Sequence, residues 1–200
     1  FSNTLLIAVS AGAFATALGG AGAIGLHWSR FRLKRLLEGL SFLPMITPEL
    51  IIGVALLLLF ANLGVPLSLF TVFLAHVTFC LPFTWLIVTA RLSEFDASLL
   101  EAARDLGATE WQALRRVILP LAAPGLVSAF LMAVTLSMED FVITFFVSGP
   151  GSSTLAVHIY GMIRLGVSPV INALSVLLLA GTAVLAWSTR RMVSSLGRGG

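Results

Sequence analysis

Five long runs of apolar residues constrain this chain more than any other feature. They cover residues 4–26, 40–63, 67–90, 121–141 and 167–187, and each has about the 20 residues that a helix needs to cross the hydrocarbon core of a bilayer. Only 10% of the residues are charged, against about 25% in a soluble domain. The sequence therefore predicts an all-α polytopic membrane protein of about five spanning helices, with residues 1–200 forming a single transmembrane domain.

The basic residues fall between these runs and indicate how the chain is oriented. They cluster at residues 30–35, 91–116 and 190–198, and basic clusters near the ends of spans mark the cytoplasmic side of a membrane. Of the 12 Lys and Arg residues, every one except Arg164 is then cytoplasmic. This predicts an outside N-terminus and a cytoplasmic C-terminus. Because the clusters are short and lie beside spans, we expect no nucleic-acid partner.

One polar segment between the third and fourth runs reads EAARDLGATEWQALRRVILP over residues 101–120. Ser98 and Thr109 each precede Glu or Gln by three residues, the spacing of a capping box. Gly107 suits the left-handed conformation that ends a helix, and Pro120 suits the first turn of the next one. We expect two short helices broken by a glycine. Such a projection suits docking into a partner's groove, and an amphipathic loop lying in the membrane interface stays open as the alternative.

This segment resembles the EAA loop of permease subunits of binding-protein-dependent ABC importers. The family pattern is EAA, three residues, Gly, nine residues and Ile-x-Leu-Pro, and the chain departs from it only by having Val117 for Ile. The resemblance implies that residues 91–120 insert into a cleft on a cytoplasmic ATPase subunit and couple its closure to the permease. The residues that it assigns to ATPase coupling are Glu101, Ala102, Ala103, Asp105, Gly107, Leu119 and Pro120.

From about residue 30 onward the chain is similar to permeases of spermidine/putrescine-type importers. The strings that carry this likeness are HVTFCLPF at 76–83, LEAARDLGA at 100–108, LSMEDFV at 136–142 and GVSP at 166–169. The likeness implies a type I ABC importer permease fold in a bacterial inner membrane, with the first of six helices expected before Phe1. It also implies a paired permease forming a heterodimer, an ABC ATPase dimer, and a periplasmic or lipid-anchored solute-binding protein.

Three acidic residues lie in or beside apolar runs. Burying an ionised side chain in lipid costs free energy, so such residues are expected to face the bundle interior or a water-filled path. They are Glu49, Glu139 and Asp140. A path lined by acids favours cations, so these residues suit a polyamine substrate. For Glu49 the open alternative is capping of a helix broken at Pro48. For the adjacent pair it is aqueous exposure at a helix end.

Two aromatic residues complete the predicted substrate pathway. Tyr160 can stack on a cation, with a plain interfacial position as the alternative, and Trp85 suits either the pathway or the interface. His76 and Cys80 have the i, i+4 spacing of a soft-metal pair. Two ligands make a weak site, so we predict a hydrogen-bonded core histidine instead and no metal.

The first apolar run carries small residues at every fourth position, namely Ala11, Ala15, Gly19 and Ala23. Small residues at this spacing let helix backbones approach closely in lipid. The run is therefore predicted to be a packing face.

The sequence has no Gly-x-x-x-x-Gly-Lys-Ser/Thr motif, the loop that cradles ATP phosphates. We therefore expect no enzymatic activity and no cofactor in this chain, with ATP and Mg²⁺ bound by the partner ATPase, and translocation by alternating access. Three alternatives stay open: an ABC importer for another cationic or small organic solute, an ion-coupled secondary transporter, and a purely structural membrane subunit.

Overall fold

A computed structural model describes residues 1–27, 34–96, 98–165 and short pieces between 172 and 187. The predicted last span at 167–187 and the basic clusters at 30–35 and 190–198 lie wholly or largely outside these residues. The described elements are helices throughout: α1 Ser2–His27, α2 Lys34–Ile46, α3 Glu49–Asn62, α4 Leu69–Leu92, α5 Ser98–Asp105, α6 Glu110–Ala113, a π-helical turn Leu114–Ile118, α7 Leu119–Glu139, α8 Val142–Val147 and α9 Leu155–Leu165.

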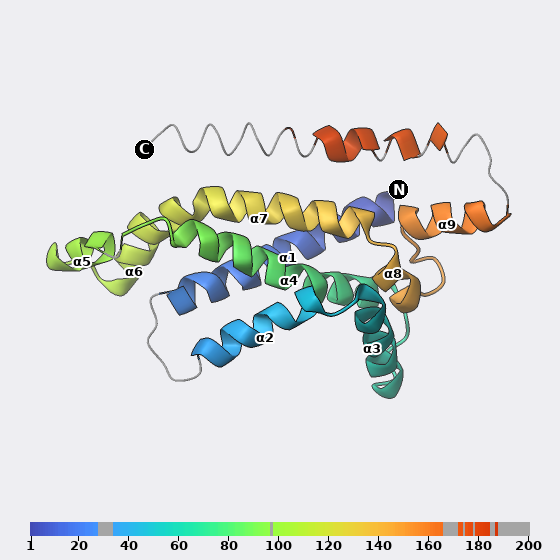
Figure 1. Cartoon of the computed structure of the whole chain (residues 1–200), viewed down its shortest axis with the longest axis horizontal. Coiled ribbons are helices and arrows are strands. Elements are labelled where there is room, and N and C mark those ends of the chain that lie inside the picture. The colour runs from blue at the N-terminus through green and yellow to red at the C-terminus, as the bar shows by residue number, and fades with distance from the viewer. Residues whose placement is uncertain are drawn as a thin grey trace.

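Three long helices, α1, α4 and α7, pack on one another and form the centre of the molecule (Figure 1). Among the described residues, three helical segments are long and apolar enough to cross a membrane: Ser2–His27, Leu69–Leu92 and Glu110–Glu139. The last of these runs without a break through α6, the π-turn and α7. Three of the predicted spans are therefore present as membrane-length helices.

The small residues of α1 do form a packing face. Ala11 and Ala15 are fully buried, and a Cβ atom added at Gly19 would overlap the Thr84 hydroxyl of α4. That hydroxyl donates a hydrogen bond to the Ala15 carbonyl at 2.8 Å. Close approach of the two backbones thus depends on the absence of side chains on this ridge, and the prediction is confirmed.

The predicted second span is two helices rather than one. Proline lacks an N–H and disfavours helical geometry at the residue before it, and the chain breaks between α2 and α3 at Thr47 and Pro48. The two helices have 13 and 14 residues, about 20 Å each at 1.5 Å per residue. Neither reaches across the roughly 30 Å of a hydrocarbon core alone, and α3 leaves the bundle at a steep angle (Figure 1).

The two ends of the bundle carry different structures. Helices α5 and α6 lie at one end, and α8, α9 and the start of α3 lie at the other (Figure 1). At the second end the amide of Asn3 donates to the carbonyls of Gly151 and Ser153 at 3.1 and 3.2 Å. The Thr4 hydroxyl accepts from the Leu155 N–H at 2.8 Å. These bonds tie the start of α1 to the turn that precedes α9.

Candidate functional site

The turn between α5 and α6 has the geometry that its glycine predicts. Gly107 has φ of +83°, a conformation that other residues rarely adopt. Its N–H donates to the Arg104 carbonyl at 2.8 Å, and the Ala108 N–H donates to the Ala103 carbonyl at 3.0 Å. This pair of bonds is the Schellman motif, which satisfies the last carbonyls of a helix. The expected helix–Gly–helix segment is confirmed.

Of the two predicted capping boxes, one is confirmed and one is wrong. At α6 the Gln112 N–H donates to Thr109 Oγ1 at 3.3 Å, and Gln112 Oε1 accepts from the Thr109 N–H at 2.9 Å. At α5 the helix already includes Ser98. The Ser98 N–H donates to Asp96 Oδ1 at 2.9 Å. The side chain that accepts a hydrogen bond at the start of α5 is therefore that of Asp96, two residues before the predicted Ser98.

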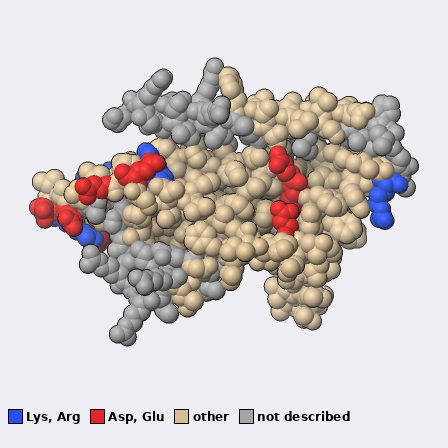
Figure 2. Space-filling model, viewed as in Figure 1, with Lys and Arg blue, Asp and Glu red and all other residues tan. Residues whose placement is uncertain are grey.

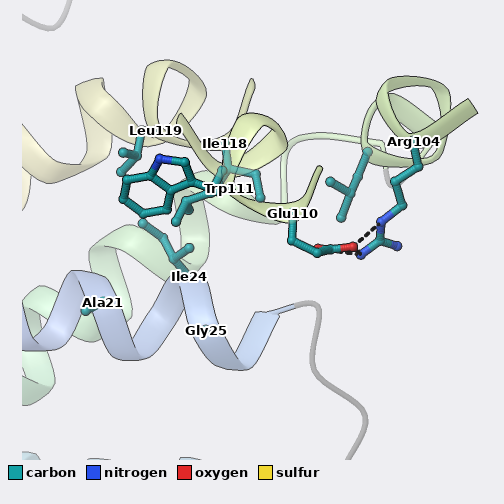
Figure 3. Close-up of a pocket in the computed structure, with 10 residues that line it drawn as sticks. Ala21, Ile24, Gly25, Arg104, Glu110, Trp111, Ile118 and Leu119 are labelled. Atoms are coloured by element: carbon teal, nitrogen blue, oxygen red, sulfur yellow. Dashed lines mark hydrogen bonds and ion pairs between the residues drawn. The ribbon is translucent and has the colours of Figure 1, made fainter. Parts of the chain in front are cut away.

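An ion pair that the sequence analysis missed bridges α5 and α6 across the glycine turn. Arg104 Nε lies 3.0 Å from Glu110 Oε1, and Nη2 lies 3.0 Å from Oε2, a bidentate arrangement (Figure 3). The hydrogen bond and charge of the Glu110 carboxylate raise the pKa of the Arg104 guanidinium. The signal was two opposite charges flanking Gly107, and it becomes readable only once the turn is known.

The α5–α6 segment has an anchored face and an exposed face. Leu100, Ala113 and Ile118 are buried with Leu92 of α4 and Ala23 of α1 in one apolar cluster. The expected coupling residues Glu101, Ala102 and Asp105 are exposed. Beside them, Leu106 is 89% exposed and Trp111 is 65% exposed, so apolar surface remains uncovered at this end.

A groove of about 700 Å³ separates this segment from the end of α1. Figure 3 shows Trp111 and Leu119 on one side of it and Ile24 of α1 on the other. The segment joins α7 directly, because the π-turn continues the helix into Leu119 and Pro120. Pro120 has no N–H to bond back along the helix, and a wide π-turn just before it accommodates that loss. α6, the π-turn and α7 thus form one continuous helical element.

Acidic residues that are distant in sequence lie on neighbouring elements toward the other end. Glu49 begins α3, α3 packs against α8, and Glu139 ends α7 just before α8. Figure 2 shows acidic side chains crossing an otherwise uncharged part of the surface at this place. Glu49 and Glu139 are both exposed. Glu49 also lies in the first turn of α3, where a negative charge complements the helix dipole, so its structural alternative stays open.

Asp140 behaves differently from its neighbour Glu139. Its carboxylate is buried, and Oδ2 lies 3.2 Å from His76 Nε2 of α4. The Thr144 hydroxyl of α8 donates to the same oxygen at 2.7 Å. The prediction that His76 is a hydrogen-bonded core histidine is confirmed. The partner of Asp140 is a histidine on another helix, which the sequence did not predict.

The two predicted aromatic residues lie in separate places. Tyr160 of α9 is partly exposed, and its ring centroid is 4.5 Å from that of Phe141, the residue after Asp140. Trp85 is half-buried. Its ring lies against Gly22 of α1, where an added Cβ atom would overlap it. The structure thus places Tyr160 against Phe141, which follows the acidic pair in sequence, and leaves Trp85 farther along α4.

A bundle of membrane-length helices with a helical projection at one end and acidic residues toward the other is the architecture expected of a transport permease subunit. The fold is that of a type I ABC importer permease. Of this chain, 97% aligns with 93% of a chain of the MetNI methionine ABC transporter, at a TM-score of 0.84 and 23% identity. Residues 8–196 match the family described as "Binding-protein-dependent transport system inner membrane component", and the chain belongs to this family.

Two curated relatives come from Escherichia coli K12. The chain is 42% identical over 183 residues to the spermidine/putrescine transport system permease protein PotC. It is 40% identical over 197 residues to the putrescine transport system permease protein PotI. Each comparison covers 92% of this chain and 69% of the relative. The predicted family and fold class are confirmed.

Proposed function

We propose that this chain is the membrane-spanning subunit of an ATP-driven importer that translocates polyamines delivered by a solute-binding protein. The names of the two curated relatives support this substrate class. The exposure of Glu49 and Glu139 on neighbouring elements near the α7–α8 junction supports it independently. A polyamine carries several ammonium groups, and carboxylates favour such cations over anions.

The exposed face of the α5–α6 segment is the surface on which the partner ATPase docks in this proposal. Glu101 and Asp105 supply polar contacts there, and Leu106 and Trp111 supply apolar ones. ATP and Mg²⁺ bind the ATPase dimer and not this chain. Closure of the ATPase pair pushes the segment, α7 transmits the movement, and the heterodimer of this chain with its paired permease opens toward the binding protein. The C-terminus is then cytoplasmic.

The observation that carries the proposal is the exposure of two acidic side chains, Glu49 and Glu139, on neighbouring elements near the α7–α8 junction. Glu139→Gln and Glu49→Gln, each in the assembled importer in proteoliposomes, are expected to raise the polyamine concentration for half-maximal uptake. Thr78→Val is the control, because Thr78 is exposed on α4 and its hydroxyl bonds only within that helix, to the Leu74 carbonyl. Unchanged polyamine uptake in both pathway variants would contradict the proposed substrate path. Uptake that survives ATP depletion would favour an ion-coupled transporter instead.

A further inference from the structure

We propose that His76 is a positioning residue that holds the Asp140 carboxylate inside the protein by a hydrogen bond, so that Glu139 alone of the adjacent acidic pair presents its charge to the substrate. This inference deepens the proposed function and rests on it. It assigns unlike roles to two neighbouring carboxylates that the sequence makes equivalent.

The buried cluster around His76 joins three helices. His76 lies two turns inside α4, about 10 Å from its first residue at 1.5 Å per residue, and its side chain is 0% exposed. Its Nδ1 is 2.6 Å from Ser137 Oγ of α7, and its Nε2 is 2.8 Å from Thr144 Oγ1 of α8. These partners are 61 and 68 residues away in sequence.

The hydrogen bonds identify the tautomer of His76. Thr144 has one hydroxyl proton, and it points to Asp140 Oδ2 at 2.7 Å. The Thr144 oxygen must then accept from His76, so Nε2 carries a proton and faces both Thr144 and Asp140. The imidazole therefore stabilises the carboxylate of Asp140 through Nε2–H, whatever the state of Nδ1.

Asp140 also holds the backbone of the α7–α8 junction. Its Oδ1 accepts from the Ile143 N–H at 3.2 Å, and its Oδ2 accepts from the Thr144 N–H at 2.8 Å. The first N–H groups of a helix have no partner within it, so this carboxylate satisfies donors at the start of α8. His76, Ser137 and Thr144 thereby fix α4, α7 and α8 at one point, directly beside Glu139.

This arrangement turns the Asp140 carboxylate toward partners within the protein rather than toward a substrate. A buried carboxylate requires an oppositely charged or hydrogen-bonding partner, and Asp140 has four contacts of this kind from His76, Ile143 and Thr144. Glu139 is exposed. The hydrogen-bonded order Ser137, His76, Asp140 is the same as in the catalytic triad of a serine hydrolase. These residues are at most 6% exposed, however, so no substrate reaches them.

The test separates positioning from substrate contact by comparing half-saturation with maximal rate. Importers reconstituted with the paired permease, ATPase and binding protein would carry Glu139→Gln, Asp140→Asn, His76→Leu or His76→Gln. Thr78→Val is the matched control, since Thr78 is exposed on α4 and its hydroxyl bonds only within that helix, to the Leu74 carbonyl. Uptake would be measured over a range of polyamine concentrations.

Glu139→Gln is expected to raise the half-saturating polyamine concentration about fivefold or more, the effect of one lost charge contact near the surface. Asp140→Asn and His76→Leu should instead lower the maximal rate about tenfold or more with nearly unchanged half-saturation, because each leaves a buried partner unpaired. His76→Gln, which keeps an N–H donor, should recover much of that rate even if His76→Leu fails to assemble. The double variant His76→Leu with Asp140→Asn should be no worse than either single variant.

Two results would overturn the inference while leaving the proposed function intact. One is that Asp140→Asn raises half-saturation as much as Glu139→Gln, which would place Asp140 on the substrate. The other is that both His76 variants behave like Thr78→Val. Failure of the proposed function looks different, because no variant would then change the dependence on polyamine at all.

A labelling measurement gives a second, activity-independent readout. Cys80 is the single cysteine of the chain, so Cys80→Ala provides a cysteine-free background. A charged, water-soluble thiol reagent is expected to modify Glu139→Cys readily and to leave Asp140→Cys unmodified. Equal labelling at both positions would contradict the burial on which the inference depends.

Discussion

The Arg104 guanidinium forms a bidentate ion pair with the Glu110 carboxylate across the Gly107 turn, with Nε–Oε1 and Nη2–Oε2 distances of 3.0 Å each. Exposed ion pairs stabilise proteins little in general, but planar bidentate geometry is the favourable case. Here the pair links two short helices. In the proposed function, the angle between them determines which exposed side chains face the ATPase.

Charge reversal tests the ion pair. Arg104→Glu is expected to lower coupled ATPase activity severalfold, because two carboxylates then repel across the turn. Arg104→Glu combined with Glu110→Arg should restore most of the activity. The loss in the single variant should be smaller at high salt, which screens exposed charges. If the double variant stays as poor as the single one, the pair does not act through its mutual contact.

Gly107 tests the turn itself. A left-handed conformation costs a non-glycine residue about 1–2 kcal/mol, although a side chain there meets nothing within 4 Å. Gly107→Leu is expected to uncouple transport from ATP hydrolysis, and Gly107→Asn should be milder because Asn tolerates this conformation better. Gly161→Ala in α9 is the control, as it has open space and no positive φ. Wild-type uptake by Gly107→Leu would refute the prediction.

Gly19 tests the packing of the bundle. Adding a methyl group there forces α1 away from Thr84 and from the α4 backbone, and overpacking of this kind costs about 1–3 kcal/mol. Gly19→Ala should therefore lower the thermal unfolding midpoint in detergent. Gly25→Ala on the same helix should not, because its added methyl meets nothing within 4 Å. Equal midpoints for the two variants would argue against the observed α1–α4 contact.

Leu106 tests the proposed docking surface. It is 89% exposed beside the coupling residues, and apolar anchors at an interface are often worth 2 kcal/mol or more, about thirtyfold in affinity. Leu106→Asp is expected to abolish copurification of the ATPase. Leu63→Asp, at an exposed position outside the α5–α6 segment, should retain it. Retention of the ATPase by both variants would place the docking surface elsewhere.

Local sequence signals predicted local structure well. The left-handed Gly107, the Thr109–Gln112 capping box and the small-residue ridge of α1 are all as expected, since each depends on residues within one or two turns. A capping side chain was predicted at Ser98 for the start of α5, but the oxygen that accepts the Ser98 N–H there belongs to Asp96. The Pro48 break was recognisable, but its consequence, two short helices at different angles, follows from tertiary packing.

The pairing of His76 with Asp140 lay beyond sequence reasoning. Nothing in the spacing of two residues on different spans states that they face each other at one depth in the bundle. Glu139 and Asp140 looked alike because they are adjacent and similar in chemistry. Their difference arises where α7 ends, since the chain turns there and directs one side chain outward and the other toward α4.

The most direct test of the central claim is polyamine-stimulated ATP hydrolysis in proteoliposomes that contain this chain, its paired permease, the ATPase and the binding protein. Polyamine-loaded binding protein is expected to stimulate hydrolysis, and Gly107→Leu should abolish that stimulation. Stimulation by a different solute, with none by polyamine, would contradict the proposed substrate. Absence of any ATPase association would contradict the coupling role of the α5–α6 segment.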